Sequence, residues 1–214
     1  MELRCSAFLF DLDGVLVDSR AVVDRVCRLW AQRHGLDPEQ VLRIAHGRRS
    51  RDTVRTAAPH LDADREAAWI DAVELADIAG LTAVPGSSAL LAALPKARWA
   101  VVTSCGRPLA ERRLTAVGLP IPAIVVTSED VLQGKPAPDA YRLGAKRLGC
   151  DPAACIVFED APAGVAAGRN AGARVIALTT MLAPHELAGA DATIPDFTAM
   201  KVRRDHDAFV VTVG

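Results

Sequence analysis

The feature that most restricts the fold of this chain is an alternation of short apolar segments with helical segments in its second half. The apolar runs are too short for stable helices, and segments with helical spacing lie between them; the runs are RWAVVTS, AIVVTS, ACIVFED and ARVIAL. Strands that alternate with helices in this way are joined by right-handed crossovers and form a parallel sheet covered by helices on both faces. The pattern therefore predicts an α/β fold.

One further apolar strand, at residues 7–10, lies far from the others in the sequence. Between it and the alternating part, the apolar residues recur at helical spacing, and no convincing strand is found. We therefore predict that residues 1–18 and 82–214 form an α/β core, and that residues 19–81 form an α-helical domain inserted after the first strand. Because ligands of open α/β sheets bind outside the carboxyl ends of the strands, this insertion is expected to cover the site as a lid.

Composition limits the partners of the chain. Its 214 residues, half of them hydrophobic, can bury a substantial core, and a net charge of -1 gives no field that would attract nucleic acid or an anionic membrane. Five cysteines without regular spacing are typical of reduced thiols in the cytoplasm, and no apolar stretch reaches the length of a membrane span. We therefore predict a soluble, cytoplasmic protein that binds neither nucleic acid nor membranes.

The first strand ends in two acids, in the segment FLFDLDGVLVDS. Side chains alternate between the two faces of a strand, so Asp11 and Asp13 are expected to point the same way. Two neighbouring carboxylates repel each other, so their closeness at a strand end needs a structural or functional reason. Farther along this segment, Asp18 and Ser19 are predicted to cap the first helix of the insertion.

Polar residues also end other strands of the predicted sheet. Thr103 and Ser104 follow one strand, Glu159 and Asp160 follow another, and Lys135 lies in the proline-stiffened loop GKPAPDAY. The topology brings these groups to one crevice together with the first acid pair. Carboxylates gathered at such a site suit a hard divalent cation, and Mg²⁺ held by a few carboxylates and a substrate phosphate is the commonest case.

Four segments, taken in this order with the insertion after the first, resemble the haloacid dehalogenase-like superfamily, in its phosphatase and phosphomutase branch with a small helical cap. The segments are DLDGVLVDS, VVTS, GKPAPDAY and FEDAPAG, and the similarity extends to about Phe197. The resemblance implies a Rossmann-like parallel sheet core with an inserted α-helical cap. It also implies a small phosphorylated metabolite as the substrate and a monomeric protein.

The resemblance assigns roles to the acids. It implies that Asp11 is the nucleophile that forms an aspartyl phosphate, and that Asp13 is the general acid and base. It places Mg²⁺ on the Asp11 carboxylate, the Asp13 backbone carbonyl and Asp160, with Glu159 as a further ligand or as a partner outside the ligand shell.

The resemblance also implies contacts with the substrate. Ser104 or Thr103, together with Lys135, is expected to bind the phosphoryl oxygens. Cys105 occupies a position where this family often has glycine, and without a nearby base it is expected to be a packed small residue.

The loop HGRRSRDTV in the insertion has two readings. It is either a solvated basic turn, or it resembles the cap loop of sugar and polyol phosphate phosphatases, in which case His46, Arg48 and Arg49 bind the substrate.

The leading hypothesis is a Mg²⁺-dependent phosphatase that hydrolyses a sugar or polyol phosphate. One alternative is a phosphomutase similar to β-phosphoglucomutase, although Val22 and Val23 lie where that branch has a histidine. The other is a non-catalytic binding or regulatory member of the same fold, although such relatives usually lack one of the acids.

Overall fold

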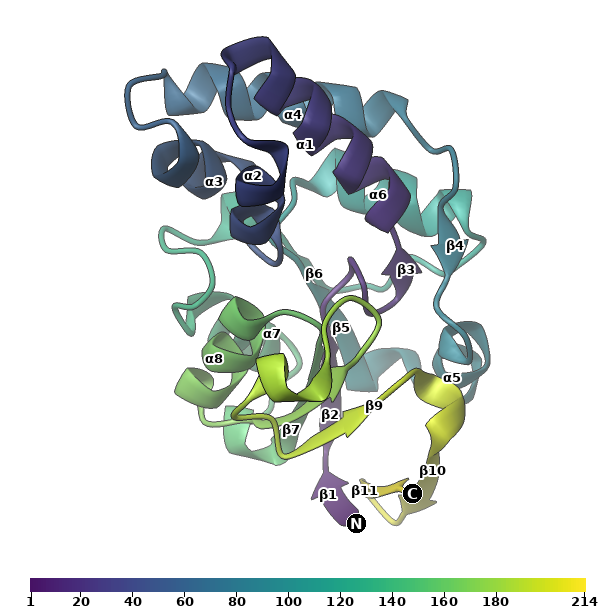
Figure 1. Cartoon of the computed structure of the whole chain (residues 1–214). Helices are drawn as coiled ribbons and strands as arrows, with labels where there is room; N and C mark the ends of the chain where they lie inside the picture. The colour runs from purple at the N-terminus through teal and green to yellow at the C-terminus, as the bar shows by residue number, and fades with distance from the viewer.

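Six strands form one parallel sheet through the centre of the molecule in the computed structural model, which describes residues 1–214 (Figure 1). Their order across the sheet is β6-β5-β2-β7-β8-β9, and every neighbouring pair is parallel. The strands are β2 (Ala7–Phe10), β5 (Trp99–Val102), β6 (Val125–Val126), β7 (Cys155–Glu159), β8 (Arg174–Leu178) and β9 (Ala192–Ile194). The predicted α/β fold is confirmed.

Both faces of the sheet are covered, and the alternation of side chains along β2 divides the core into two. Phe8 and Phe10 belong to one apolar cluster, whereas Ala7 and Leu9 belong to the other. The first cluster includes residues of α5 (Ser87–Ala93) and α6 (Arg107–Ala116), and the second includes residues of α7 (Asp139–Arg147) and α8 (Pro162–Ala171). All residues of β2, β5 and β7 are buried, which explains why these strands are apolar apart from Glu159 at the end of β7.

A second, antiparallel sheet contains both ends of the chain. Its strands are β1 (Glu2–Cys5), β10 (Met200–Asp205) and β11 (Ala208–Val213), in the order β1-β11-β10. The segment DAFVVTVG thus contributes β11 to this sheet and not to the edge of the parallel one. The ring centroids of Phe209 and Phe8 lie 5.1 Å apart, so the second sheet packs on the first core cluster.

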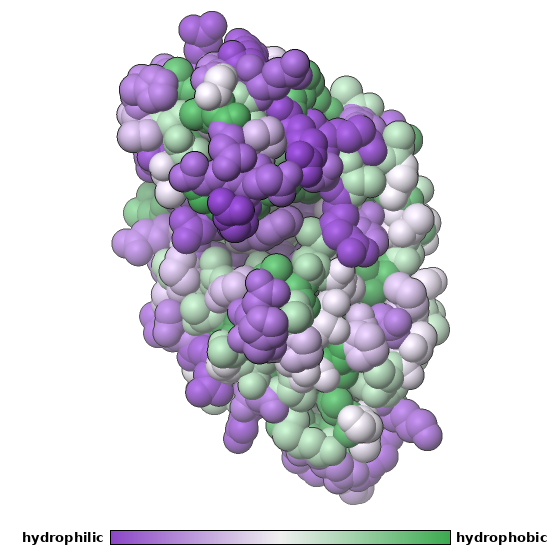
Figure 2. Space-filling model, in the orientation of Figure 1, coloured by the Kyte–Doolittle hydropathy of each residue, from purple (hydrophilic) through white to green (hydrophobic).

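Four helices form the inserted segment, and they lie together beyond one end of the parallel sheet (Figure 1). They are α1 (Arg20–His34), α2 (Pro38–Ala45), α3 (Ser50–Ala57) and α4 (Ala63–Ala76), and they are called the helical insertion below. They share an apolar cluster of their own, and a short ribbon of β3 (Val17–Asp18) and β4 (Thr82–Ala83) connects them to the sheet. Figure 2 shows that the face of the insertion turned toward the viewer is largely hydrophilic.

No helix of the chain combines the length and the apolar character needed to cross a bilayer.

Candidate active site

Three buried carboxylates meet at the carboxyl ends of β2 and β7. Asp11 follows β2, Glu159 ends β7 and Asp160 comes next, and one oxygen of each lies within 4.8 Å of the others. The two strands are neighbours in the sheet, with Phe10 paired to Phe158. The shared sheet edge therefore explains why residues so distant in the sequence form one cluster.

Lys135 lies against this cluster. Its Nζ is 2.8 Å from Asp11 Oδ1 and 2.6 Å from Glu159 Oε1, and its side chain is 1% exposed. Tyr141 donates a hydrogen bond to the same Glu159 oxygen at 2.6 Å, and the Asp160 N–H donates to Glu159 Oε2 at 3.1 Å. Both oxygens of Glu159 thus have partners within the protein, whereas Asp11 has one oxygen free of Lys135.

Burial dominates the electrostatics of the cluster. It raises the pKa of Asp11 to about 7, although the neighbouring Lys135 lowers it. Burial, followed by the charges of Glu159 and Asp11, holds the pKa of Asp160 well above its ordinary value. Burial also disfavours the charged form of Lys135, but the adjacent carboxylates outweigh it and raise the pKa of Lys135.

The carboxylate cluster fits a divalent cation. Three buried carboxylates face a single ammonium group, so negative charge is in excess, and their oxygens are the ligand type that Mg²⁺ prefers. Gly14 contributes by lacking a side chain: its φ is +73°, and a Cβ atom there would lie 1.9 Å from Asp160 Oδ2. The residues and the backbone around them therefore suit the predicted metal.

Asp13 is held by two partners at the same end of the sheet. Ser19 Oγ donates to Asp13 Oδ1 at 2.7 Å, and Arg113 Nη1 lies 2.6 Å from Asp13 Oδ2. Ser19 occupies the N-cap position of α1 as predicted, but its hydroxyl makes no bond to the helix end and donates to Asp13 instead. Asp18 accepts from the Arg20 N–H at 3.2 Å, as a residue at a helix start can.

Two site residues were missed by sequence reasoning. Arg113 on α6 is 3% exposed, and its Nη2 lies 2.7 Å from Oε2 of Glu74 on α4, so it joins Asp13 to the helical insertion. Burial raises the pKa of Glu74 to about 7 against the opposing effect of Arg113. A signal was present, because both charged residues lie on the buried side of their helices, Arg113 beside Leu109 and Glu74 beside Ile70.

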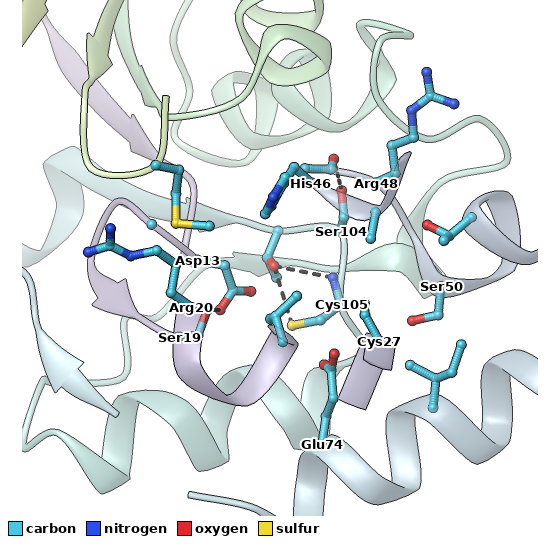
Figure 3. A pocket seen from close by; sticks show the side chains of 18 of the residues that line it. Asp13, Ser19, Arg20, Cys27, His46, Arg48, Ser50, Glu74, Ser104 and Cys105 are labelled. Atoms are coloured by element: carbon cyan, nitrogen blue, oxygen red, sulfur yellow. Dashed lines mark hydrogen bonds between the residues drawn. The ribbon is translucent and has the colours of Figure 1, made fainter. Parts of the chain in front are cut away.

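A cavity of about 90 Å³ lies between the helical insertion and the sheet edge (Figure 3). Its wall combines both predicted catalytic acids and Asp160 with apolar residues of the insertion, among them Val23, Cys27, Trp30, Val41 and Ile70. Lys135 and Glu159 are not part of the wall. A wider groove of about 790 Å³ shares His46 and Arg48 with the cavity.

The hydroxyls predicted to bind phosphate both line the cavity. Thr103 Oγ1 accepts from the Cys105 N–H at 3.2 Å, and Ser104 Oγ donates to the Gly47 carbonyl of the insertion at 3.0 Å (Figure 3). Burial raises the pKa of the Cys105 thiol well above its ordinary value, which keeps it protonated and unreactive, in line with a packed small residue.

Only part of the basic loop of the insertion lines the cavity. His46 and Arg48 line the cavity, although Figure 3 shows the Arg48 guanidinium directed away from its centre. Arg49 is absent from the wall: its Nε lies 2.6 Å from Asp52 Oδ2, and its Nη1 donates to the Leu132 carbonyl of the core at 3.2 Å. The predicted contact of Arg49 with substrate therefore has no support from the observed wall.

The sequence profile of the haloacid dehalogenase-like hydrolase family matches residues 5–172. This range contains both acid pairs, Lys135 and the helical insertion. The chain belongs to the haloacid dehalogenase-like hydrolase family. The resemblance inferred from the four sequence segments is thus confirmed.

Named relatives support the assignment to this family. Hexitol phosphatase A of Escherichia coli (strain K12) is 42% identical, over 98% of this chain and 99% of its own. Glycerol-1-phosphate phosphohydrolase 2 of Saccharomyces cerevisiae is 35% identical, over 84% of this chain and 77% of its own. Among solved structures, a hydrolase from Pseudomonas syringae superposes with a TM-score of 0.81 at 27% identity, covering 89% of this chain and 94% of that one. The predicted enzyme class, a phosphatase of this hydrolase family, is confirmed.

Proposed function

We propose that the protein is a Mg²⁺-dependent phosphatase that hydrolyses a small sugar or polyol phosphate through an aspartyl-phosphate intermediate. The observation that carries this proposal is the pairing of a buried acid, Asp11, with a second acid, Asp13, in the wall of one cavity. The names of the two curated relatives, a hexitol phosphatase and a glycerol-1-phosphate phosphohydrolase, support the substrate class.

The two acids have different surroundings and therefore different tasks. Lys135 occupies Oδ1 of Asp11, so the other oxygen is the one that attacks phosphorus as the bond to the ester oxygen breaks. Asp13 is less buried and would give a proton to the departing alkoxide, then take one from the water that hydrolyses the acyl phosphate. Splitting the displacement into two steps lowers the barrier of each.

A bound Mg²⁺ would supply neutralising charge between the carboxylates and the phosphoryl oxygens. We propose that the Asp11 carboxylate, Asp160 and the Asp13 backbone carbonyl hold it. Glu159 is the weaker candidate for a ligand, because Lys135, Tyr141 and a backbone N–H already occupy its oxygens. Its role in this proposal is to orient Lys135.

The remaining contacts concern the substrate. Thr103, Ser104 and Lys135 would bind the phosphoryl oxygens, and His46 would face the leaving group, whereas Arg48 directs its guanidinium away from it. We propose that residues 19–81 act as a cap that excludes bulk water while phosphoryl transfer takes place. A monomer in the cytoplasm remains the expectation from the sequence.

A panel assay tests the proposal. The protein is incubated with Mg²⁺ and with glycerol 1-phosphate, a hexitol phosphate, glucose 6-phosphate or β-glucose 1-phosphate, and both phosphate and isomerised sugar are measured. We expect phosphate without isomerised product. EDTA should lower the rate by about 10²-fold or more, because several kcal/mol of charge stabilisation is removed, and excess Mg²⁺ should restore it.

Other outcomes of this assay identify the alternatives. Isomerisation without phosphate release would show a mutase, although Val23 presents an apolar side chain to the cavity. Release that persists in EDTA would contradict the metal requirement, and no turnover of any compound would favour a binding role.

A further inference from the structure

A single buried guanidinium joins the second acid of the site to the helical insertion. Arg113 Nη1 lies 2.6 Å from Asp13 Oδ2, and Nη2 lies 2.7 Å from Glu74 Oε2. The three residues come from three separate parts of the chain: the loop after β2, helix α4 of the insertion, and helix α6 of the core. Figure 3 shows Glu74 directed from its helix toward Cys105 in the cavity wall.

The chemistry of arginine restricts how Asp13 is oriented. A guanidinium group has donors only, arranged in a planar fork. Oδ2 of Asp13 therefore accepts from Arg113, and the contact prevents free rotation of the carboxylate. The other oxygen, Oδ1, faces Ser19, whose hydroxyl can either donate or accept. Oδ1 is therefore the oxygen that remains available to give and receive the catalytic proton.

Stability alone is a poor explanation for this arrangement. Burying an arginine between two acids is often no better for stability than packing apolar residues of similar volume. The Nε of Arg113 is buried without a hydrogen-bond partner, which is a further unfavourable contribution. A charged bridge kept at this position in the wall of the cavity is better explained by a role in the reaction.

We propose that Arg113 is a positioning residue that holds Asp13 in the orientation needed to protonate the leaving group, and that Glu74 ties this orientation to the seating of α4 on α6. This proposal rests on the proposed function. The proton donor is thus fully oriented only when the insertion lies against the core, so that the leaving group is protonated in a closed cavity. Ester oxygens of poor leaving groups, such as alkoxides, need this proton, whereas a nitrophenolate leaves without it.

The test compares two substrates that differ in this need. For Arg113→Lys, whose ammonium is a point charge without the planar fork that fixes the two carboxylates, kcat/KM is measured with glycerol 1-phosphate and with p-nitrophenyl phosphate. This parameter reports the steps up to departure of the leaving group, so it separates protonation from later hydrolysis. We expect a loss of about 30- to 100-fold on the alkyl phosphate and of about 3-fold or less on the aryl phosphate. Arg112→Lys, an exposed neighbour on the same helix, should change neither.

A second pair of variants tests the link to the insertion and does not depend on the folding of Arg113→Lys. Glu74→Leu should lower kcat/KM for the alkyl phosphate by about 10-fold with little effect on the aryl phosphate, and Glu74→Gln, which can still accept from Arg113, should restore most of it. Equal losses on both substrates, or no loss, would overturn the proposal in either pair. If the wild-type protein releases no phosphate from either compound, the proposed function itself fails and this inference fails with it.

Discussion

Replacing Asp11 with asparagine is expected to reduce phosphate release by about 10⁴-fold or more, since removal of a nucleophile in a covalent mechanism eliminates nearly all of the catalysis. The amide keeps the size of the side chain and can still accept a hydrogen bond from Lys135, but it cannot attack phosphorus. Asp11 is almost fully buried between Lys135 and the other carboxylates, so no other side chain can take its place without rearrangement. The measurement is phosphate release under saturating glycerol 1-phosphate and Mg²⁺.

Two further observations make the Asp11 test specific. Trapping the wild-type protein in acid after brief exposure to a ³²P-labelled substrate should leave label on the chain, whereas Asp11→Asn should carry none. Asp151→Asn is the matched control, because Asp151 precedes β7 at the opposite end of the sheet, and asparagine can cap the following turn equally well. Labelling of Asp11→Asn, or a residual rate within 10-fold of the wild type, would exclude Asp11 as the nucleophile.

Replacing Lys135 with methionine is expected to damage both activity and folding. Its Nζ is the only cation within ion-pair distance of Asp11 and Glu159, so its removal leaves buried carboxylates uncompensated. Removing one partner of a buried ion pair is expected to lower the free energy of unfolding by about 3–5 kcal/mol. The rate should fall by about 10²–10³-fold, because the phosphoryl group loses a fixed positive charge.

The metal offers a way to recognise the cause of the Lys135 defect. Urea unfolding is followed for both proteins in EDTA and in Mg²⁺, and binding to the native state adds stability by mass action. Because the variant has a larger excess of negative charge at the cluster, Mg²⁺ should stabilise it more than it stabilises the wild type. Lys146→Met, an exposed lysine on α7, should behave as the wild type in both solutions. A variant that Mg²⁺ fails to stabilise would show that the cluster does not bind the ion.

The parallel sheet and the positions of the main acids were predictable from local patterns. An apolar run marks a buried strand, and the residue after it lies at the strand end, so Asp11, Glu159 and Asp160 could be assigned to one sheet edge before any coordinates were known. The helical insertion was predictable for the same reason, because helical spacing is also a local property. These features depend on residues close together in the sequence and on the few topologies that a parallel sheet allows.

The partners of those acids depend on packing between distant segments. Arg113 and Asp13 are 100 positions apart, and Arg113 and Glu74 are 39 apart, so no local pattern relates them. Serine is a residue type that often caps a helix with its side chain, yet the ribbon that precedes α1 turns the Ser19 hydroxyl toward Asp13. Which charged groups meet is set by how α4 packs on α6, and burial strengthens each such contact because water no longer competes for it. Strand ends follow from the order of residues along the chain, whereas the orientation of the proton donor follows from the three-dimensional packing of the insertion against the core.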